Sequence, residues 1–390
     1  MRMPPSLNWN LLGLYPSSPV STTGKLMQLL KSTIKDITPP DRAAMAAAQK
    51  EIDYCLKPPG SLGRLEDIAR QIAGITGRVH NSISKKAIVV MMADNGVYKE
   101  GIAMYPQDVT RIGADFVTSG RMGINFLAHY AKADIIAVDI GIDAVIENPK
   151  VLHRKVRYGT ANFLKSQAMT EEEAISAIET GIEVTLEAIQ QGYDLFGVGE
   201  IGIGNTTASA AMLYAFTKAP LDRVVGRGAG LTDEAFANKK DVVRQAVQLH
   251  QPDPENAIDV LSKVGSLDIA GMTGVYLACA AKKVPVVTDG LISNVAALTA
   301  IRLAPESIGY MIPSHLSFEP GALLLTEITG LTPMLNMDMR LGEGTGCALL
   351  FPIIEAALRM IEEMGTFAVL GKSREEIGSK AMAYRGKFPQ

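Results

Sequence analysis

Polar side chains follow five short apolar runs of this sequence, at or near the point where each run ends. They are Asp94-Asn95-Gly96, Asp139, Glu200, Asp289-Gly290 and Ser314-His315. Because the carboxyl ends of parallel strands meet at one edge of an open sheet, where ligands bind, we expect these side chains to line a single polar site. Any one of them alone is typical of a turn or a helix N-cap. Together they indicate a site, without specifying its chemistry.

The segment GEIGIGNTTASAAM, residues 199–212, has the composition of a loop that holds a phosphate. It passes from an apolar run through closely spaced glycines into a helical pattern, and Gly202 and Gly204 let the backbone approach a ligand. Amide and hydroxyl donors follow at the expected helix N-terminus: Asn205, Thr206 and Thr207. The segment matches neither a P-loop nor a dinucleotide fingerprint, so an ordinary strand–helix turn is the competing interpretation.

Two further glycine-rich segments add charged groups. GRGAG (226–230) places Arg227 on a flexible loop, and Lys239 follows on the next expected helix, where lysines are usually solvated. RLGEGTG (340–346) brackets Glu343 with glycines, so that a loop can present this carboxylate to a substrate without crowding. A carboxylate within hydrogen-bond reach of a reacting proton can act as a general base. From spacing alone, an exposed loop glutamate is the competing interpretation.

The composition excludes several classes of protein. The chain has 390 residues, of which 47% are apolar and 20% charged, and its formal net charge is −3. These proportions are typical of globular proteins. Basic and acidic residues are mixed along the chain, which argues against a nucleic-acid-binding face. Polar residues interrupt every apolar run and the start lacks a signal-peptide pattern, so we expect no membrane span and a cytoplasmic location. Three scattered cysteines are expected to be reduced core thiols: Cys55, Cys279 and Cys347.

Short unbroken apolar runs alternate with helical segments from residue 86 onward, which is typical of parallel strands buried on both faces. The runs are AIVVMM (87–92), IIAVDI (135–140), LFGVG (195–199), VPVVT (284–288) and IGYMI (308–312). The clearest helix lies between the second and third runs, where Thr170 and Glu173 fit a capping box and Gly192 fits a C-cap.

Helical patterns flank this central region at both ends. Residues 26 to about 80 indicate helices around a turn at KPPGSLG (57–63), and a helix follows Gly346 before a polar tail. We therefore predict an α/β fold, with a parallel sheet flanked by helices and a small helical domain built from both termini. The expected boundaries are a loosely ordered extension over 1–25, the small domain over 26–85 plus 355–390, and a large α/β catalytic domain over 86–354.

An ordered set of segments resembles those of the nicotinate-nucleotide:dimethylbenzimidazole phosphoribosyltransferase family of cobamide biosynthesis. The segments are KPPGSLGRLE, ADNGV followed by YPQDVT, GEIGIGNTT, VGRGAG, PVVTDG, SHLSFEPG and RLGEGTG, and the resemblance spans residues from about 45 to 365. It implies a Rossmann-like sheet, a small helical domain from both termini, and a homodimer whose partner subunit helps to close the site. It also implies transfer of the phosphoribosyl group of nicotinate mononucleotide to 5,6-dimethylbenzimidazole or a related azole.

The resemblance assigns roles to the candidate site residues. Glu343 matches the family's general base, and Glu200 and Asp289 match acidic residues that support it or the ribose. The expected phosphate- and ribose-binding residues are Gly202, Gly204, Asn205, Thr206, Lys239, Ser317 and Gly342. The expected base pocket comprises Met92, Asn95, Tyr105, Gln107 and Leu341.

These residues suit the implied reaction. The pyridinium of nicotinate mononucleotide is cationic, so nicotinate leaves without needing a proton, and nearby carboxylates would stabilise a transition state of oxocarbenium character. The azole attacks C1′ through one nitrogen while a glutamate takes the proton from the other, and the β-nucleotide is inverted to an α-riboside phosphate. No metal or cofactor is expected, since the five scattered histidines offer no ligand set.

Three departures from the family's usual pattern leave the acceptor open between benzimidazole, purine and phenolic bases. Asn95 stands where many members have histidine, Ala322 follows EPG where histidine is common, and GRGAG replaces the frequent GRGTG. A heterodimer subunit that uses phenol or p-cresol is therefore an alternative, as is a non-catalytic partner subunit. A metal-dependent phosphatase is a further alternative because carboxylates at strand ends suit Mg²⁺; its ligands would be Asp94, Asp139 and Asp289.

Overall fold

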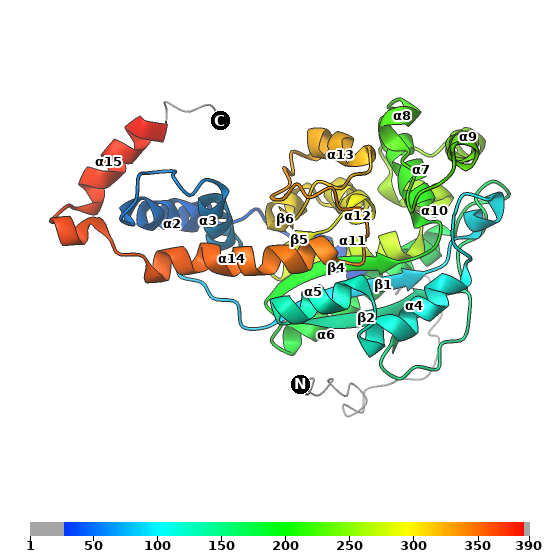
Figure 1. The fold of residues 1–390 in the computed structure, drawn as a ribbon, viewed down its shortest axis with the longest axis horizontal. Coiled ribbons are helices and arrows are strands. Elements are labelled where there is room, and N and C mark those ends of the chain that lie inside the picture. Colours follow the sequence, from blue (N-terminus) through cyan, green and yellow to red (C-terminus); the bar gives the residue numbers. More distant parts are fainter. Residues whose placement is uncertain (1–26, 386–390) are drawn as a thin grey trace.

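A single parallel sheet forms the centre of the molecule (Figure 1). The computed structural model describes residues 27–385, so the extension expected over 1–25 lies outside the described residues. The strand order is β3-β2-β1-β4-β5-β6, and all neighbouring strands are parallel. The strands are β1 Lys86–Ala93, β2 Ala133–Gly141, β3 Leu152–His153, β4 Leu195–Ile201, β5 Val286–Thr288 and β6 Met311–Pro313. The predicted fold class is confirmed.

Four of the five predicted strands lie where the apolar runs indicated, within two residues at each end. The prediction over 308–312 was wrong in its first half, because Pro305–Tyr310 forms the 3-10 helix η3 and β6 begins only at Met311. Proline at the start of η3 fixes a φ angle that suits a helical turn. The short strand β3 was not predicted, since two residues carry no periodic signal.

Helices cover both faces of the sheet (Figure 1). Helices α11 (Leu267–Ala281) and α12 (Leu291–Leu303) pack on one face, and α4 (Asp108–Ser119), α5 (Gly123–Ala131) and α14 (Thr345–Glu363) pack on the other. The remaining elements are α1 Gln28–Asp36, α2 Arg42–Tyr54, α3 Arg64–Thr76, η2 Gly96–Glu100, α6 Glu171–Gln190, α7 Asn205–Thr217, α8 Leu221–Val224, α9 Asp233–His250, α10 Ala257–Val264, α13 Gly321–Thr329, η4 Phe367–Leu370 and α15 Arg374–Arg385.

Strand β1 and helix α6 show how local sequence determines these elements. All eight residues of β1 are buried because helices cover both faces, which explains the unbroken apolar run. Helix α6 begins with the predicted capping box, in which the Thr170 hydroxyl accepts from the Glu173 N–H and the Glu173 carboxylate accepts from the Thr170 N–H. Gly192 lies directly after the C-cap residue Gln191, with a left-handed φ of 88°.

Helices α6 and α11 pack with their backbones in contact. A Cβ atom on Gly181 of α6 would lie 1.9 Å from the carbonyl oxygen of Gly271 on α11. Likewise, a Cβ atom on Gly274 would lie 2.0 Å from the carbonyl oxygen of Ile178. Only glycine permits this approach, so these positions fix how α11 lies against the sheet and where its N-terminus points.

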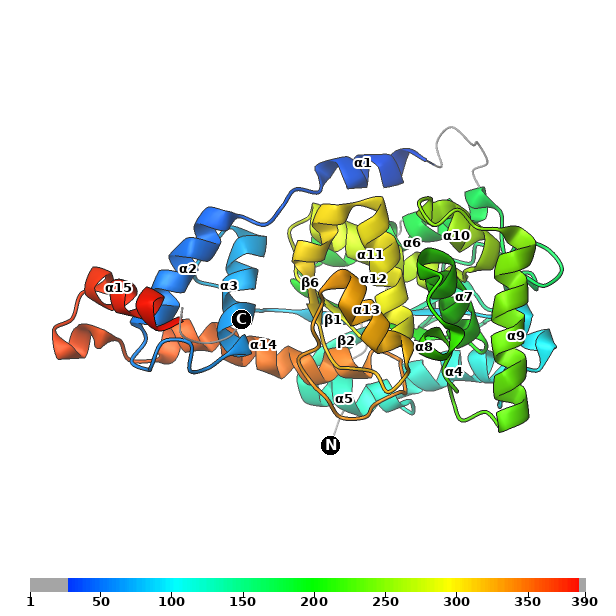
Figure 2. The ribbon, with the colours of Figure 1, turned by 90° about the horizontal axis from the view of Figure 1, so that it is seen from above.

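A cluster of helices lies beside the sheet, where α2, α3, α15 and the end of α14 pack together (Figures 1 and 2). A buried ion pair of 2.7 Å between Lys57 and Glu66 closes the KPPGSLG turn there. Helix α1 packs instead on α6 and α11, where the Leu30 N–H donates to Glu179 Oε1 at 2.9 Å. Part of the expected polar tail forms α15, and the proposed domain boundaries stay a prediction.

None of the helices within residues 27–385 is both long and apolar enough to cross a membrane.

Candidate active site

The carboxyl ends of the parallel strands bring the predicted polar residues to one edge of the sheet. Glu200 lies near the end of β4, Asp289 directly follows β5, and Ser314 and His315 follow β6. Helices α7, α12 and α14 begin at this edge, so their N-terminal N–H groups and dipoles favour negative charge there. The edge therefore combines buried acids with sites suited to an anion.

Glu343 lies in a tight loop directly before α14. Gly342, Glu343 and Gly344 all have left-handed φ angles, of 85°, 62° and 87°. This conformation is costly for a glutamate, and such strain is concentrated at functional sites. The side chain is buried, and Oε2 accepts from the Ile124 N–H at the start of α5 at 3.0 Å. Burial raises the pKa of Glu343, which suits a group that must take up a proton.

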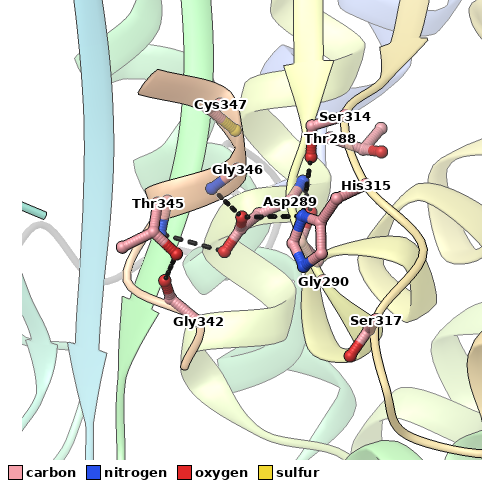
Figure 3. A network of polar contacts seen from close by, with 12 residues as sticks. Thr288, Asp289, Gly290, Ser314, His315, Ser317, Gly342, Thr345, Gly346 and Cys347 are labelled. Carbon is pink, nitrogen blue, oxygen red and sulfur yellow. Dashed lines mark hydrogen bonds and ion pairs between the residues drawn. The ribbon is translucent and has the colours of Figure 1, made fainter. Parts of the chain in front are cut away.

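Asp289 holds this loop in place (Figure 3). Its carboxylate accepts from the Gly344 N–H at 3.0 Å and from the Gly346 N–H at 2.8 Å, at the first turn of α14. His315 Nδ1 lies 3.7 Å from Asp289 Oδ1, but burial lowers the pKa of His315 to about 4, so at neutral pH the contact involves a neutral imidazole. Burial also raises the pKa of Asp289 to about 7. The hydrogen bonds of Asp289 fix the backbone beside Glu343.

Glu200 contacts the same loop from the other side. Its Oε1 accepts from the Glu343 N–H at 3.4 Å, and its Oε2 accepts from the Asn205 side-chain amide at 2.5 Å. Asn205 also donates to Asp268 at 2.8 Å, so its side-chain amide contacts two carboxylates. Burial and the neighbouring Asp268 charge raise the pKa of Glu200 well above its usual value. The structure thus brings together the three predicted catalytic acids: Glu343, Glu200 and Asp289.

Lys239 is the buried cation of the predicted phosphate site. Its side chain is fully enclosed, and Nζ donates to the Thr206 hydroxyl in the first turn of α7 at 2.9 Å. Burial lowers the pKa of Lys239 to about 8, against an opposing effect of the Glu319 carboxylate. Glu319 Oε1 accepts from the Gly228 N–H at 2.9 Å, which fixes the GRGAG loop beside the lysine. Lys240 points elsewhere and pairs with Asp222.

The remaining predicted phosphate and ribose residues lie around this arrangement. Ser317 is buried, and its hydroxyl lies 3.7 Å from where a Cβ atom of Gly290 would be, at the start of α12 (Figure 3). Gly342 packs against Glu200: a Cβ atom there would lie 2.2 Å from Oε1. Gly204, with φ of 96°, is the N-cap residue of α7.

The predicted base-pocket residues occupy different depths. Met92 is fully buried in β1, whereas Leu341 is 58% and Tyr105 51% exposed. Leu341 and Glu343 both lie against Gly123, which places an apolar side chain beside the carboxylate. Asn95 is buried, and its Nδ2 donates to the Ile203 carbonyl while its Oδ1 has no hydrogen-bond partner. Gln107 donates to Asp143.

Comparison with known proteins identifies the family. A profile described as Phosphoribosyltransferase matches residues 37–370. The nicotinate-nucleotide–dimethylbenzimidazole phosphoribosyltransferase of Alkaliphilus metalliredigens is 49% identical over 346 residues, which cover 88% of this chain and 99% of that protein. The chain belongs to this phosphoribosyltransferase family. It is therefore an enzyme, a pentosyltransferase, and the identification made from the ordered segments is confirmed.

Further relatives of this phosphoribosyltransferase agree. The enzyme of the same name from Clostridium tetani is 47% identical over 343 residues, covering 88% of this chain and 95% of that protein. The crystal structure of this family's enzyme from Thermus thermophilus matches with a TM-score of 0.80 at 37% identity, over 85% of this chain and 99% of that chain. The sheet and its flanking helices are thus the family's fold.

The three carboxylates that the magnesium alternative requires contact different partners in the structure. Asp139 pairs with Lys155 at 2.8 Å, Asp94 accepts from the Asp143 N–H, and Asp289 accepts from two backbone N–H groups. Within residues 27–385, no group of three or more histidine, cysteine or acidic side chains is arranged to hold a metal ion. The contacts of these residues therefore do not support the magnesium alternative.

Sequence reasoning missed two buried acids at this site, Asp268 and Glu319. Asp268 lies in the first turn of α11 within the apolar segment GSLDIAGMTG, where an acid is typical of a helix start. Glu319 lies in SHLSFEPG, and this segment was recognised without a role for its glutamate. Both acids are flanked by apolar residues or glycines, which indicates burial. Because acidic side chains are rarely buried without a partner, this pattern could have marked them as candidate site residues.

Proposed function

We propose that the enzyme transfers the phosphoribosyl group of nicotinate mononucleotide to a lower-ligand base, most directly 5,6-dimethylbenzimidazole or a related azole. The products are nicotinate and an α-riboside phosphate for cobamide assembly. The observation that carries the proposal is the buried Lys239 ammonium group, which donates to the Thr206 hydroxyl at the same sheet edge as the buried carboxylate of Glu343. The relatives' names supply the substrates, and the geometry is consistent with their chemistry.

In this proposal the phosphate binds at the N-terminus of α7, where backbone N–H groups and Lys239 supply positive charge. The ribose then extends toward Glu200 and Glu343. Among the described residues, the hydrogen-bond donors to these carboxylates are uncharged N–H groups, so the charge of each carboxylate in its ionised form can stabilise a cationic ribose. The C1′–nitrogen bond to the pyridinium breaks, and its electron pair leaves with neutral nicotinate nitrogen.

Glu343 completes the reaction as the general base. One nitrogen of the azole attacks C1′ from the face opposite the leaving group, which gives the α configuration. The carboxylate of Glu343 takes the proton from the other nitrogen, so the product is neutral at the base. Leu341 beside Glu343 offers the apolar surface that an aromatic base needs.

The test is an acceptor series with a matched pair of variants. The purified chain is incubated with nicotinate mononucleotide and, separately, dimethylbenzimidazole, adenine, phenol and p-cresol, and products are identified by mass spectrometry. Glu343→Gln should lose transfer, whereas Glu179→Gln, which alters a buried glutamate on α6, should retain it. Product only from phenols would change the acceptor, and no product from any base would favour the non-catalytic alternative. Activity should survive a chelator, and loss on chelation would contradict the proposed metal-free chemistry.

We also propose that the enzyme acts in the cytoplasm as a dimer with an identical or homologous chain. Sedimentation velocity of the purified chain tests self-association. A monomer that turns over without a second chain would contradict the dimer.

A further inference from the structure

Asp268 is a fully buried carboxylate whose two oxygens face different elements. Oδ1 accepts from the Ile269 N–H at 2.9 Å and from the hydroxyl of Ser266, and these bonds fix the first turn of α11. Oδ2 points the other way and accepts from the side-chain amide of Asn205 at 2.8 Å. A helix-capping role accounts for the first oxygen only.

Asn205 connects Asp268 to the catalytic acids. The amide nitrogen of its side chain carries two hydrogens, one for Asp268 at 2.8 Å and one for Glu200 at 2.5 Å. All three side chains are buried, so water does not compete for these bonds. The bond to Asp268 therefore restrains the amide that holds Glu200.

Gly202 makes this connection sterically possible. A Cβ atom at that position would lie 2.5 Å from the Ala93 carbonyl oxygen, 3.0 Å from Asp268 Oδ2 and 3.2 Å from the Asn205 amide nitrogen. The missing side chain lets β4, α7 and α11 converge. The glycine attributed to phosphate binding from the sequence thus also accommodates the carboxylate–amide–carboxylate chain.

Asp289 is a second acid near Glu200, and among residues 27–385 no lysine or arginine forms an ion pair with the Glu200 carboxylate. Asp289 approaches from the end of β5, and Glu343 contributes its backbone N–H from the loop before α14. Burial, followed by the charge of Asp268, raises the pKa of Glu200. Burial likewise raises the pKa of Asp268, with Ser266 and Asn205 acting in the opposite direction.

We propose that Asp268 is a positioning residue of the transferase: acting through Asn205, it fixes the Glu200 carboxylate toward the ribose and adds negative charge behind it. This inference rests on the proposed function, in which Glu200 stabilises the cationic ribose. Asp268 lies behind Asn205 and does not touch the substrate. Its effect on turnover therefore passes through Glu200.

A double-mutant cycle tests this dependence. It compares Asp268→Asn, Glu200→Gln and the double variant, with the kcat and KM for nicotinate mononucleotide as readout. An asparagine side chain has only one acceptor oxygen. Asp268→Asn therefore loses the hydrogen bond either to Asn205 or to the start of α11. We expect kcat to fall roughly 100-fold with little change in KM, as for a misplaced catalytic group. The double variant should be no slower than Glu200→Gln alone.

The pH profile gives a readout that a merely structural residue would not change. Removing the Asp268 charge lowers the pKa of Glu200, so the acid limb of kcat/KM should shift to lower pH in Asp268→Asn. The matched control Glu179→Gln alters another buried acid and should leave the profile unchanged. Multiplicative losses in the cycle, together with an unmoved acid limb, would overturn the inference.

A second variant covers the case in which Asp268→Asn does not fold. Asn205→Ala removes the link between Asp268 and Glu200 but leaves the hydrogen bonds at the start of α11 intact. It should show the same loss of kcat as Asp268→Asn. In the Glu200→Gln background it should cause no further loss. Failure of the proposed function is distinguishable, because the wild-type chain would then show no transfer at all. An active wild type with an active Asn205→Ala variant would overturn only the role of Asp268.

Discussion

Gly199 determines where the catalytic loop can lie, and replacing it with alanine should displace Glu343. The added Cβ atom would lie 2.3 Å from the carbonyl oxygen of Glu343 and 2.7 Å from the Gly344 nitrogen. Ordinary contact begins at 3.4 Å, so the loop must move by about 1 Å. Both obstructing atoms belong to backbone in a left-handed turn, so no side-chain rotation relieves the clash.

A displacement of this size is large for catalysis. Misplacing a catalytic group by about 1 Å can cost roughly 100-fold in rate, so kcat of Gly199→Ala should fall by about that factor. Overpacking a core position also costs about 1–3 kcal/mol of folding free energy, so the melting temperature should fall while the protein remains folded. Transfer kinetics and thermal unfolding followed by circular dichroism measure the two effects separately.

Gly365→Ala is the matched control, because that position is exposed and nothing lies within 4 Å of its added Cβ atom. It should leave kcat unchanged. A Gly199→Ala enzyme with wild-type kcat would refute the reasoning, since it would show that the loop before α14 yields without moving the carboxylate.

Three further predictions follow from the site and its surroundings. Glu343→Gln should lower kcat by roughly 10²- to 10⁴-fold and remove the Glu343 ionisation from the acid limb of the pH–rate profile, leaving that of Glu200, which a stopped assay across pH measures. Lys239 loses its charge as pH rises through about 8, so kcat/KM for nicotinate mononucleotide should fall above that pH. Lys239→Met should raise KM by about 10- to 100-fold. A variant that keeps the basic limb of the wild-type profile would contradict this role of Lys239. Lys57→Met leaves Glu66 buried without its cation and should cost about 3–5 kcal/mol in urea unfolding, whereas the exposed Lys372→Met should cost almost nothing.

The sheet could be predicted from the sequence because its strands are buried on both faces. This burial requires unbroken apolar runs, which the residues of β1, β2 and β4 display. The predicted strand began too early because IGY (308–310) can be buried as a strand or as a helical turn. The proline at the start of η3 favours the helical turn. A short apolar run shows that the segment is buried, but it does not show whether the segment is a strand or a turn of helix.

The site was predictable to the extent that its residues follow strands. Glu200 and Asp289 could be placed at the sheet edge for this reason, whereas the glycines around Glu343 indicated only a loop, and its role came from the resemblance to the family. The contact between Asn205 and Asp268 could not be predicted, because it joins the starts of two helices that are distant in the chain. Its geometry depends on how closely α6 and α11 pack, and no local pattern encodes that distance.

The position of α14 in the chain has a consequence for synthesis on the ribosome. This helix covers β4 and β5, where the Cys347 thiol contacts the carbonyls of Val198 and Val287, and its far end packs on α3. Helix α3 and the central strands therefore emerge long before the helix that joins them. We expect a nascent chain that stops before α14 to expose an apolar sheet face to chaperones, and to lack the anchor for Glu343. Closure of the fold and completion of the catalytic loop are thus the same late event.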